Sequence, residues 1–385
     1  MMDISRRHLL AGMGVLPLLA LSPRMALAGN WSRILVLVEL AGGNDGLNMI
    51  VPQTDPLYRQ LRPGIALSGD RLARLDERFG LNTALASLMP AWRDGDLAVV
   101  QGVGYPDPDR SHFRSIDIWD TASDSAEVLT QGWLAQLFSR EAPPGDFTTE
   151  GLVLGHDGAG PLAGAKRFVE LRNPGRFVRD AKRSPALSAE AGSNPVLQHI
   201  VRVQAEIDRA AAGLAGDGIA ATAPGLAFPK TGLGQQLELA ARVIAGQAQV
   251  AVIKVTLGGF DTHINQVSTQ HRLLEEVGAA LAAFRGSMLA AGLWDRILVM
   301  TYSEFGRRAA ENGSGGTDHG TAAPHFLLGG RVRGGFHGQA PSLASLENGD
   351  LRYTTDFRQL YSTILQSWWE VPSLWPDQPS LGLIA

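Results

Sequence analysis

Nearly continuous apolar runs, each about as long as one strand, constrain the fold of this sequence more than any other feature. Runs of this kind are typical of strands that are covered on both faces of a parallel sheet. Four clear runs and a final shorter one stand at 33–40, 96–103, 249–257, 296–302 and 325–330. We predict each of them as a strand of one sheet.

Helical patterns separate and follow these runs. Residues 82–95 precede the second run, residues 266–294 join the third to the fourth, and residues 355–370 form a closing pattern with aromatic anchors. Apolar residues recur at helical spacing in these segments. The strand–helix–strand alternation predicts an α/β fold with a mostly parallel, doubly wound sheet flanked by helices.

The bulk composition fits one sizeable domain. The chain has 385 residues, 45% of them hydrophobic, and a net charge of −4 without a long run of either sign. This charge pattern indicates no nucleic-acid partner. We predict a single domain over 29–385 with an α-rich insertion over about 134–234, which is rich in Ala, Gly and Pro and has one helical pattern at 194–215. The insertion either caps the functional site or is a helical connection without contact to it.

The first 28 residues have the layout of an export signal. A basic start is followed by an apolar stretch over 9–21 and by Ala-Leu-Ala at 26–28. The sequence SRRHLL at 5–10 resembles the twin-arginine motif, which predicts passage through the twin-arginine translocase to the periplasm or the exterior. Glycine and proline interrupt the short apolar stretch, so we expect no stable membrane span. An ordinary Sec signal, or a cytosolic chain with an apolar start, is the alternative.

Polar segments lie at the ends of the predicted strands. GGNDGLN (42–48), GYPDPDRSHFRSIDIW (104–119), GGFDTH (258–263) and SEFGR (303–307) each follow a run directly, and GGTDHGTAAPH (315–325) leads into the last one. Ligands of open α/β sheets bind beyond the carboxyl ends of the strands. The segments therefore predict one shared polar site.

Imidazoles and carboxylates gather in these segments. Four of the nine histidines and four carboxylates stand there: His112, His263, His319 and His325, with Asp45, Asp261, Glu304 and Asp318. The chain has no cysteine, which excludes thiolate ligands. Carboxylates and imidazoles together suit Zn²⁺, Mn²⁺ or a related divalent ion. We expect 315–325 to be a mobile loop that brings its acidic residue and two histidines to the strand ends.

Each residue taken alone has a simpler explanation. Asp45 between glycines is typical of a turn, and Glu304 of a helix cap. His112 is equally typical of a half-buried histidine without a ligand. The metal site is therefore a prediction from the combination of residues and not from any one of them.

The ordered motifs resemble those of one protein family. They stand at 37–52, 110–122, 258–263, 303–308, 315–322 and 354–365. Over roughly residues 33–369 they resemble the DUF1501 family, which consists of exported bacterial proteins with no settled activity. The resemblance implies an alkaline phosphatase-like fold with a two-metal site at the ends of the strands.

The resemblance also implies roles for individual residues. Metal ligands are implied at Asp45, Asp261, His263, Glu304, Asp318 and His319. Ser111 corresponds to the hydroxyl nucleophile. The pair Glu304-Phe305 stands where the alkaline phosphatase and sulfatase superfamily, near which the DUF1501 family is placed, has Asp-His. One imidazole is therefore missing there. The later Asp-His pair lies in a long glycine loop, where it either restores a ligand or serves another purpose.

Together these residues predict a metal-dependent hydrolase of phosphate or sulfate esters, with one or two Zn²⁺ or Mn²⁺ ions and a small-molecule or polysaccharide substrate. Arg110 and Arg114 flank Ser111 and are expected to clamp the anionic group. His112 or His325 is the expected general acid. The structural alternatives are surface salt bridges for the arginines and a helix N-cap for Ser111. For the whole protein, the alternative is an alkaline phosphatase-like binding or envelope-assembly protein whose chemistry has decayed.

Overall fold

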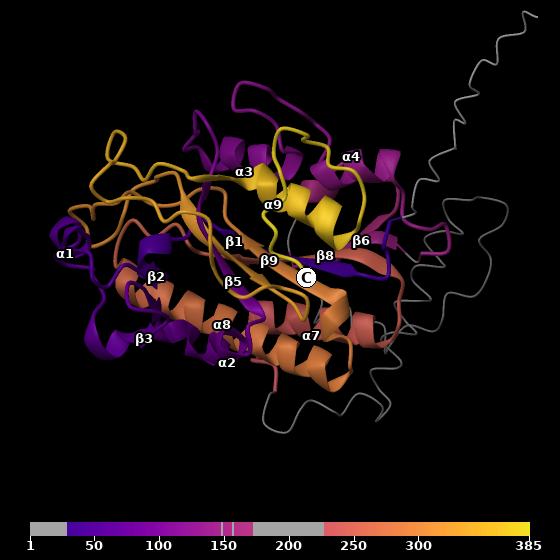
Figure 1. The fold of residues 1–385 in the computed structure, drawn as a ribbon, viewed down its shortest axis with the longest axis horizontal. Coiled ribbons are helices and arrows are strands. Elements are labelled where there is room, and N and C mark those ends of the chain that lie inside the picture. Colours follow the sequence, from indigo (N-terminus) through magenta and orange to yellow (C-terminus); the bar gives the residue numbers. More distant parts are fainter. Residues whose placement is uncertain (1–28, 148, 156–157, 172–226) are drawn as a thin grey trace, which may run out of the picture.

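The computed structural model in Figure 1 describes residues 29–147, 149–155, 158–171 and 227–385. The predicted export signal at 1–28 and the helical pattern at 194–215 lie outside the described residues. None of the described helices is both long and apolar enough to span a membrane.

A central sheet organises the described part of the chain. Its strand order is β11-β5-β10-β9-β1-β8-β6-β7, and β12 pairs with β5 beside this path. The strands are β1 Ile34–Ala41, β5 Leu97–Gly104, β6 Thr149–Leu154, β7 Phe168–Leu171, β8 Val250–Gly258, β9 Ile297–Tyr302, β10 Ala323–Leu328, β11 Gly335–His337 and β12 Thr355–Asp356. The five predicted strands all belong to it.

The sheet is largely parallel, as predicted. Strand β1 pairs in parallel with β8 on one side and with β9 on the other. Strand β10 is reversed, because it pairs antiparallel with both β5 and β9. Its first residues therefore meet the edge at which β1, β5, β8 and β9 end. This reversal brings the segment before β10 to the same edge as the four segments after the parallel strands.

Helices cover both faces of the sheet, which confirms the doubly wound α/β fold. In Figure 1, α7, α8 and α2 lie on one face, and α3, α4 and α9 on the other. The helices are α1 Pro56–Leu61, α2 Met89–Asp94, α3 His112–Thr121, α4 Trp133–Arg140, α7 Gly232–Ala245, α8 Gln266–Ala290 and α9 Phe357–Thr363. One π-helical turn, Ile364–Trp368, continues α9.

Each layer of helices has its own apolar core against the sheet. Under α7 and α8 the core includes Val36, Leu274 and Phe284. Under α3, α4 and α9 it is rich in aromatic rings, among them the fully buried Trp119 and Trp133. Burial on both faces explains why the central strands read as continuous apolar runs.

Smaller elements complete the fold. A second sheet has the order β2-β4-β3 and consists of β2 Ile50–Val51, β3 Leu72–Arg74 and β4 Gly80–Asn82. Short 3-10 helices are Gly46–Asn48, Gly69–Arg71, Thr83–Leu88, Gly160–Leu162 and Trp294–Arg296. The predicted helix over 82–95 is thus a 3-10 turn followed by α2, where Pro90 occupies the first turn of the new helix.

The predicted α-rich insertion at 134–234 differs from the structure in its described part. Residues 149–154 and 168–171 are β6 and β7, which extend the central sheet beyond β8. Their apolar runs are too short to stand out from the surrounding Ala, Gly and Pro. The rest of the insertion, 172–226, lies outside the described residues.

Candidate metal centre

One carboxylate and three imidazoles converge at the carboxyl edge of the sheet. Asp261 and His263 follow β8, His319 precedes β10, and His112 opens α3. The Oδ1 atom of Asp261 lies 3.0 Å from His263 Nε2 and 3.1 Å from His319 Nε2. Its Oδ2 atom lies 3.5 Å from His112 Nε2. We call these four residues the metal centre.

Oxygen atoms behind the rings set the orientation of two imidazoles. His112 Nδ1 lies 2.7 Å from Glu304 Oε1, and His319 Nδ1 lies 2.8 Å from the carbonyl oxygen of Arg110. A carbonyl and a carboxylate only accept hydrogen bonds, so both Nδ1 atoms carry the proton. In the neutral rings the Nε2 lone pairs then face Asp261. Metal-binding histidines are oriented in this way by their outer partners.

The Nε2 atoms lack satisfactory partners among the described residues. His112 Nε2 is buried and accepts no hydrogen bond there. The Nε2 atoms of His263 and His319 face each other at 3.0 Å. Two lone pairs and a carboxylate in such proximity repel one another unless a proton or a metal ion lies between them. A proton on His263 Nε2 or a bound cation therefore has to lie between these atoms.

The Phe305 ring packs against two of the imidazole rings. It is buried, with its ring centroid 4.9 Å from that of His112 and 4.6 Å from that of His319. At Gly43, which has a φ of +72°, a Cβ would come within 2.3 Å of the phenyl ring. Phe305, which stands where the sequence resemblance implies a histidine, thus packs against two other histidines.

Glu304 holds His112 in place. Its carboxylate accepts hydrogen bonds from the Gly42 backbone at 2.8 Å and from Ser303 Oγ at 3.2 Å, besides that of His112. The hydrogen bond to Glu304 raises the pKa of His112 above its ordinary value. Gly42 has a φ of +118°, and a Cβ there would lie 2.4 Å from the Asp261 backbone nitrogen. Glu304, predicted as a ligand, instead orients a ligand from behind.

Arg307 lies beneath Asp261 and is fully buried. It donates to Asp261 Oδ1 at 2.7 Å, to the carbonyl oxygen of Gly43 at 2.6 Å and to that of Thr317 at 3.0 Å. Burial acts to raise the pKa of Asp261, but the hydrogen bond and the positive charge of Arg307, together with the neighbouring imidazoles, outweigh it and lower the pKa to about 2. The carboxylate is therefore ionised and ready to bind a cation.

Asp45, predicted as a metal ligand, lies outside the metal centre. Its carboxylate is buried in an ion pair with Arg62 and accepts a hydrogen bond from Gln266. Its other oxygen accepts from the Leu47 backbone at 3.2 Å. These partners occupy the oxygens that a metal ion would need. The turn interpretation of this residue describes the structure better than the metal prediction.

The segment before β10 is paired along its length rather than a free loop. Gly306 N donates to the carbonyl oxygen of Thr321 at 2.6 Å, Gly320 N to that of Gly306 at 2.9 Å, and Arg308 N to that of Asp318 at 3.1 Å. The Asp318 side chain is exposed and lies 3.5 Å from His263 Nδ1. The segment therefore places His319 in the metal centre, whereas Asp318 lies on the Nδ1 side of the His263 ring.

His325, predicted to arrive on that loop as a general acid, is a core residue of β10. Its ring is buried against Trp119, with the centroids 5.3 Å apart. Burial lowers the pKa of His325 to about 3. A neutral, enclosed imidazole has no proton to donate at ordinary pH, so the structure contradicts this role.

The three residues before and within α3 have different surroundings. Arg114 donates to the carbonyl oxygens of Asp124 at 3.0 Å and Ser125 at 3.1 Å, so it supports a loop and not an anion. Arg110 forms an ion pair with Asp350 and remains partly exposed. Ser111 is the N-cap residue of α3, but its exposed side chain makes no capping hydrogen bond.

The sequence did not predict the burial of two arginines, and it did not predict that His112 lies in the metal centre. Arg307 and Arg62 pair with Asp261 and Asp45, yet in the sequence each of these arginines is typical of an ordinary surface cation. The only signal was the double arginine in SEFGRR, which did not indicate that its first member is buried. His112, predicted as a general acid, belongs to the metal centre.

A model of the DUF1501 family, described as a protein of unknown function, matches residues 89–371, well over half of the chain. This chain belongs to the DUF1501 family. The matched range of the DUF1501 protein includes all four residues of the metal centre. No curated protein matches the chain in sequence.

Solved structures resemble the DUF1501 protein only distantly. The lipoteichoic acid synthase LtaP from Listeria monocytogenes has a TM-score of 0.39 at 10% identity, covering 84% of this chain and 74% of its own. The C-terminal periplasmic domain of EcEptC from Escherichia coli, in complex with Zn, has a TM-score of 0.37 at 11% identity, covering 79% and 74%. Alkaline phosphatase from the Antarctic bacterium TAB5 has a TM-score of 0.31 at 12% identity, covering 76% and 91%. Likenesses this weak carry no argument about chemistry.

Proposed function

We propose that this DUF1501 protein is a metal-dependent hydrolase of phosphate or sulfate esters that holds one divalent ion, Zn²⁺ or Mn²⁺, on His112, Asp261, His263 and His319. The observation that carries the proposal is the convergence of three Nε2 atoms on one ionised carboxylate. A bound ion of this kind polarises the ester and activates the attacking oxygen.

The donor set fits such an ion. Nitrogen and oxygen ligands at about 2.0–2.1 Å from a tetrahedral Zn²⁺ stand roughly 3.3 Å from one another. The separations around Asp261 Oδ1, at 3.0 and 3.1 Å, are close to that value. The described residues provide one group of three such side chains with ligand atoms within 4.8 Å of one another, His112, Asp261 and His319, and His263 adjoins it through Asp261 and His319. The Asp45 carboxylate is occupied by Arg62. One ion is therefore proposed rather than two.

Ser111 is the proposed nucleophile. It stands between two residues that each contact the metal centre, since the Arg110 carbonyl accepts from His319 and the His112 ring is itself a ligand. Its hydroxyl is exposed and does not cap α3. Arg110, with 37% of its side chain exposed, is better placed than Arg114 to bind the anionic group of an ester.

The substrate class follows from the exposure of the metal centre. The side chains of Asp261 and His263 are 47% and 40% exposed. An open site of this kind admits an ester on a large molecule such as a polysaccharide, as well as a small one. Hydrolysis of esters attached to polysaccharides is thus compatible with the geometry.

Export is part of the proposed function. We propose that residues 1–28 direct the chain through the twin-arginine translocase to the periplasm or the exterior. The support is the SRRHLL sequence followed by an apolar stretch and Ala-Leu-Ala. Arg6→Lys together with Arg7→Lys should retain a folded reporter fusion in the cytoplasm. Unchanged export of that double variant would exclude the twin-arginine route.

A second candidate is a binding or envelope-assembly protein that keeps a metal ion without turnover. Two observations favour it: Phe305 fills the position of a superfamily ligand, and His325 is unable to act as a general acid. In this case the metal centre would hold the edge of the sheet together.

Metal content and turnover, measured on the mature chain, separate the candidates. We expect one divalent ion per chain by mass spectrometry, its loss in the Asp261→Ala/His319→Ala double variant, and hydrolysis of p-nitrophenyl phosphate or sulfate. His271→Ala, which changes an exposed histidine of α8, is the matched control and should retain the ion. Metal without turnover would favour the second candidate. No metal after reconstitution with Zn²⁺ and Mn²⁺ would overturn the metal centre itself.

A further inference from the structure

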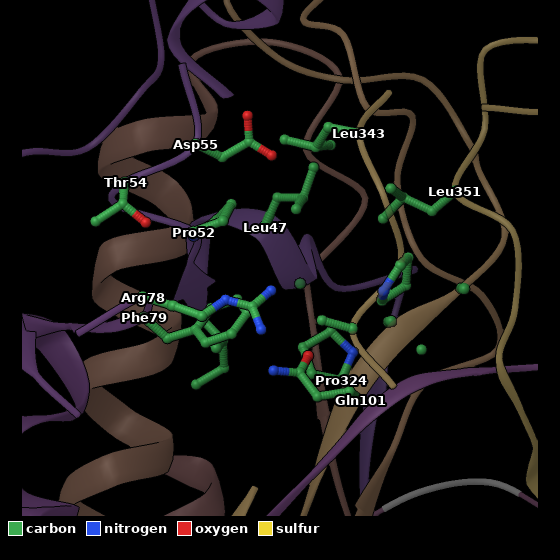
Figure 2. Close-up of a pocket in the computed structure, with 17 residues that line it drawn as sticks. Leu47, Pro52, Thr54, Asp55, Arg78, Phe79, Gln101, Pro324, Leu343 and Leu351 are labelled. Atoms are coloured by element: carbon green, nitrogen blue, oxygen red, sulfur yellow. The ribbon is translucent and has the colours of Figure 1, made fainter. Parts of the chain in front are cut away.

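A second site lies apart from the metal centre. A pocket with about 610 Å³ of empty space opens between the 3-10 turn after β1, the β5–β10 pair and the segment around residues 340–351. Figure 2 shows this pocket with its lining residues as sticks. It shares no residue with the metal centre.

The floor of the pocket contains a buried amide without a partner. Gln101 of β5 is 5% exposed, and among the described residues its Nε2 atom has no hydrogen-bond partner. Burying an amide N–H in this state is unfavourable, and such groups normally find a partner. The amide is therefore available to a ligand that brings a hydrogen-bond acceptor.

A local irregularity of the sheet lies beside this amide. The β5–β10 register shifts between Ala323 and His325, which is opposite Gln101 and Gly102. Gly102 has a φ of +59°, and Pro324 across from it has no backbone N–H to donate. Such bulges redirect side chains and occur next to binding sites. The pocket wall is thus shaped by a departure from regular pairing.

A cation stands at the same pocket. The guanidinium of Arg78 lies 5.1 Å from the centre of the Phe79 ring, and no described residue forms an ion pair with it. Figure 2 shows the Arg78 guanidinium and the Gln101 amide both reaching into the space between the labelled side chains. The nearby Asp55 caps α1, because its Oδ1 atom accepts a hydrogen bond from the Leu57 backbone at 2.9 Å.

The rest of the lining is apolar. Leu343 and Leu351 are each 5% exposed, and with Leu47 they border the pocket away from Gln101, whereas Pro324 lies beside the amide. A ligand that covers these side chains removes apolar surface from water. Its apolar part must lie next to groups that satisfy one amide and one guanidinium.

We propose that this pocket binds a small amphipathic carboxylate that carries an amide or carbonyl group next to the carboxylate. The carboxylate pairs with Arg78, the neighbouring carbonyl accepts from Gln101, and the acyl chain packs on the leucine wall. Arginine suits a carboxylate because its planar fork matches the two oxygens. This site does not depend on the proposed hydrolysis, since it shares no residue with the metal centre.

The test is a calorimetric titration of the mature chain with N-hexanoylglycine, in the presence of EDTA so that no metal ion contributes. We expect saturable binding, weakened about tenfold or more by Arg78→Gln and by Gln101→Leu. The methyl ester of N-hexanoylglycine should bind at least tenfold more weakly, since it lacks the anionic group. Arg74→Gln, at an exposed arginine of β3 outside the pocket, should leave the affinity unchanged.

Three results would overturn the proposal: no binding of N-hexanoylglycine, equal weakening by Arg74→Gln and Arg78→Gln, or equal affinity for acid and ester. Arg78 is exposed, so its substitution keeps the fold even if Gln101→Leu disturbs β5. The assay requires neither metal nor turnover. Its failure therefore leaves the proposed hydrolase untouched, and the failure of the hydrolase leaves this site untouched.

Discussion

Two aspartates at the ends of neighbouring strands have the same kind of partner and opposite roles. Asp45 follows β1 and pairs with Arg62, whereas Asp261 follows β8 and pairs with Arg307. Both arginine side chains are fully buried, but the Asp45 side chain is 1% exposed and that of Asp261 is 47% exposed. The first pair is enclosed, and the second presents its carboxylate to solvent.

The difference shows that the remaining neighbours decide the role of a carboxylate. Around Asp45 they are donors, Gln266 and the Leu47 backbone, which complete its hydrogen bonds. Around Asp261 they are imidazole Nε2 atoms, two of which have their proton held on the far side of the ring. An enclosed carboxylate with donors is a structural anchor, and an open one among lone pairs is a candidate cation site.

The largest expected effect is on stability at the enclosed pair. Asp45→Asn removes the negative charge and leaves the guanidinium of Arg62 buried without its counter-ion. We expect the free energy of unfolding to fall by about 3–5 kcal/mol, measured by denaturant unfolding of the mature chain. Metal content in the folded fraction should be unchanged. A fall below about 1 kcal/mol would mean that hydrogen bonds, and not charge, stabilise the contact between Asp45 and Arg62.

The matched change at the open pair should separate stability from metal binding. Asp261→Asn keeps an oxygen for Arg307 but loses the charge that binds a cation. We expect the affinity for Zn²⁺, measured by competition with a chromophoric chelator, to fall by about 100-fold or more. The loss of stability should be smaller than that of Asp45→Asn. If Asp45→Asn and Asp261→Asn weakened metal binding equally, the contrast drawn between the two aspartates would be wrong.

Residues behind the metal centre should matter according to how closely they hold their imidazole. Glu304 lies 2.7 Å from His112 Nδ1, so Glu304→Gln should weaken Zn²⁺ binding by about 10–100-fold. Asp318 is exposed and lies 3.5 Å from His263 Nδ1, beyond a good hydrogen bond. Asp318→Asn is therefore the control, with an expected change of about threefold or less. Equal losses would show that charge alone, without orientation, sets the affinity.

The elements that could be predicted from the sequence are those with a local signal. The five apolar runs and the long pattern over 266–294 correspond to strands and to α8, because burial on both faces and helical periodicity are properties of consecutive residues. β6 and β7 were missed, since each of them is a short run in an Ala- and Gly-rich setting. The reversal of β10 was not predicted, because strand direction depends on pairing with β5 and β9.

Site residues were predictable as a set but not in their roles. Histidines and carboxylates after strands indicate a shared edge, and the structure brings Asp261, His263, His319 and His112 together there. Whether an aspartate meets an arginine 17 residues later, as Asp45 does, is a tertiary contact without a local pattern. His325 likewise has no local pattern that predicts its burial, because its surroundings depend on a helix that is distant in the chain.

That histidine extends the contrast to imidazoles and gives a prediction about the pH dependence of stability. Burial lowers the pKa of His325 from 6.5 to about 3, so between these values the unfolded chain binds a proton that the folded protein does not. The contribution of the neutral, buried ring to the free energy of unfolding is fully present above pH 6.5 and is lost as the pH falls towards 3. Between pH 7 and pH 5 this amounts to about 2 kcal/mol.

His325→Leu removes that titration, so the loss of unfolding free energy between pH 7 and pH 5 should shrink by about 2 kcal/mol relative to the unmodified chain. Denaturant unfolding at the two pH values measures it, with His271→Leu on the exposed side of α8 as the control that should keep the full pH dependence. Because the comparison uses differences between pH values, any packing cost of the leucine cancels. An unchanged pH dependence in His325→Leu would show that folding does not lower the pKa of this imidazole, and the case against its role as a general acid would fall with that result.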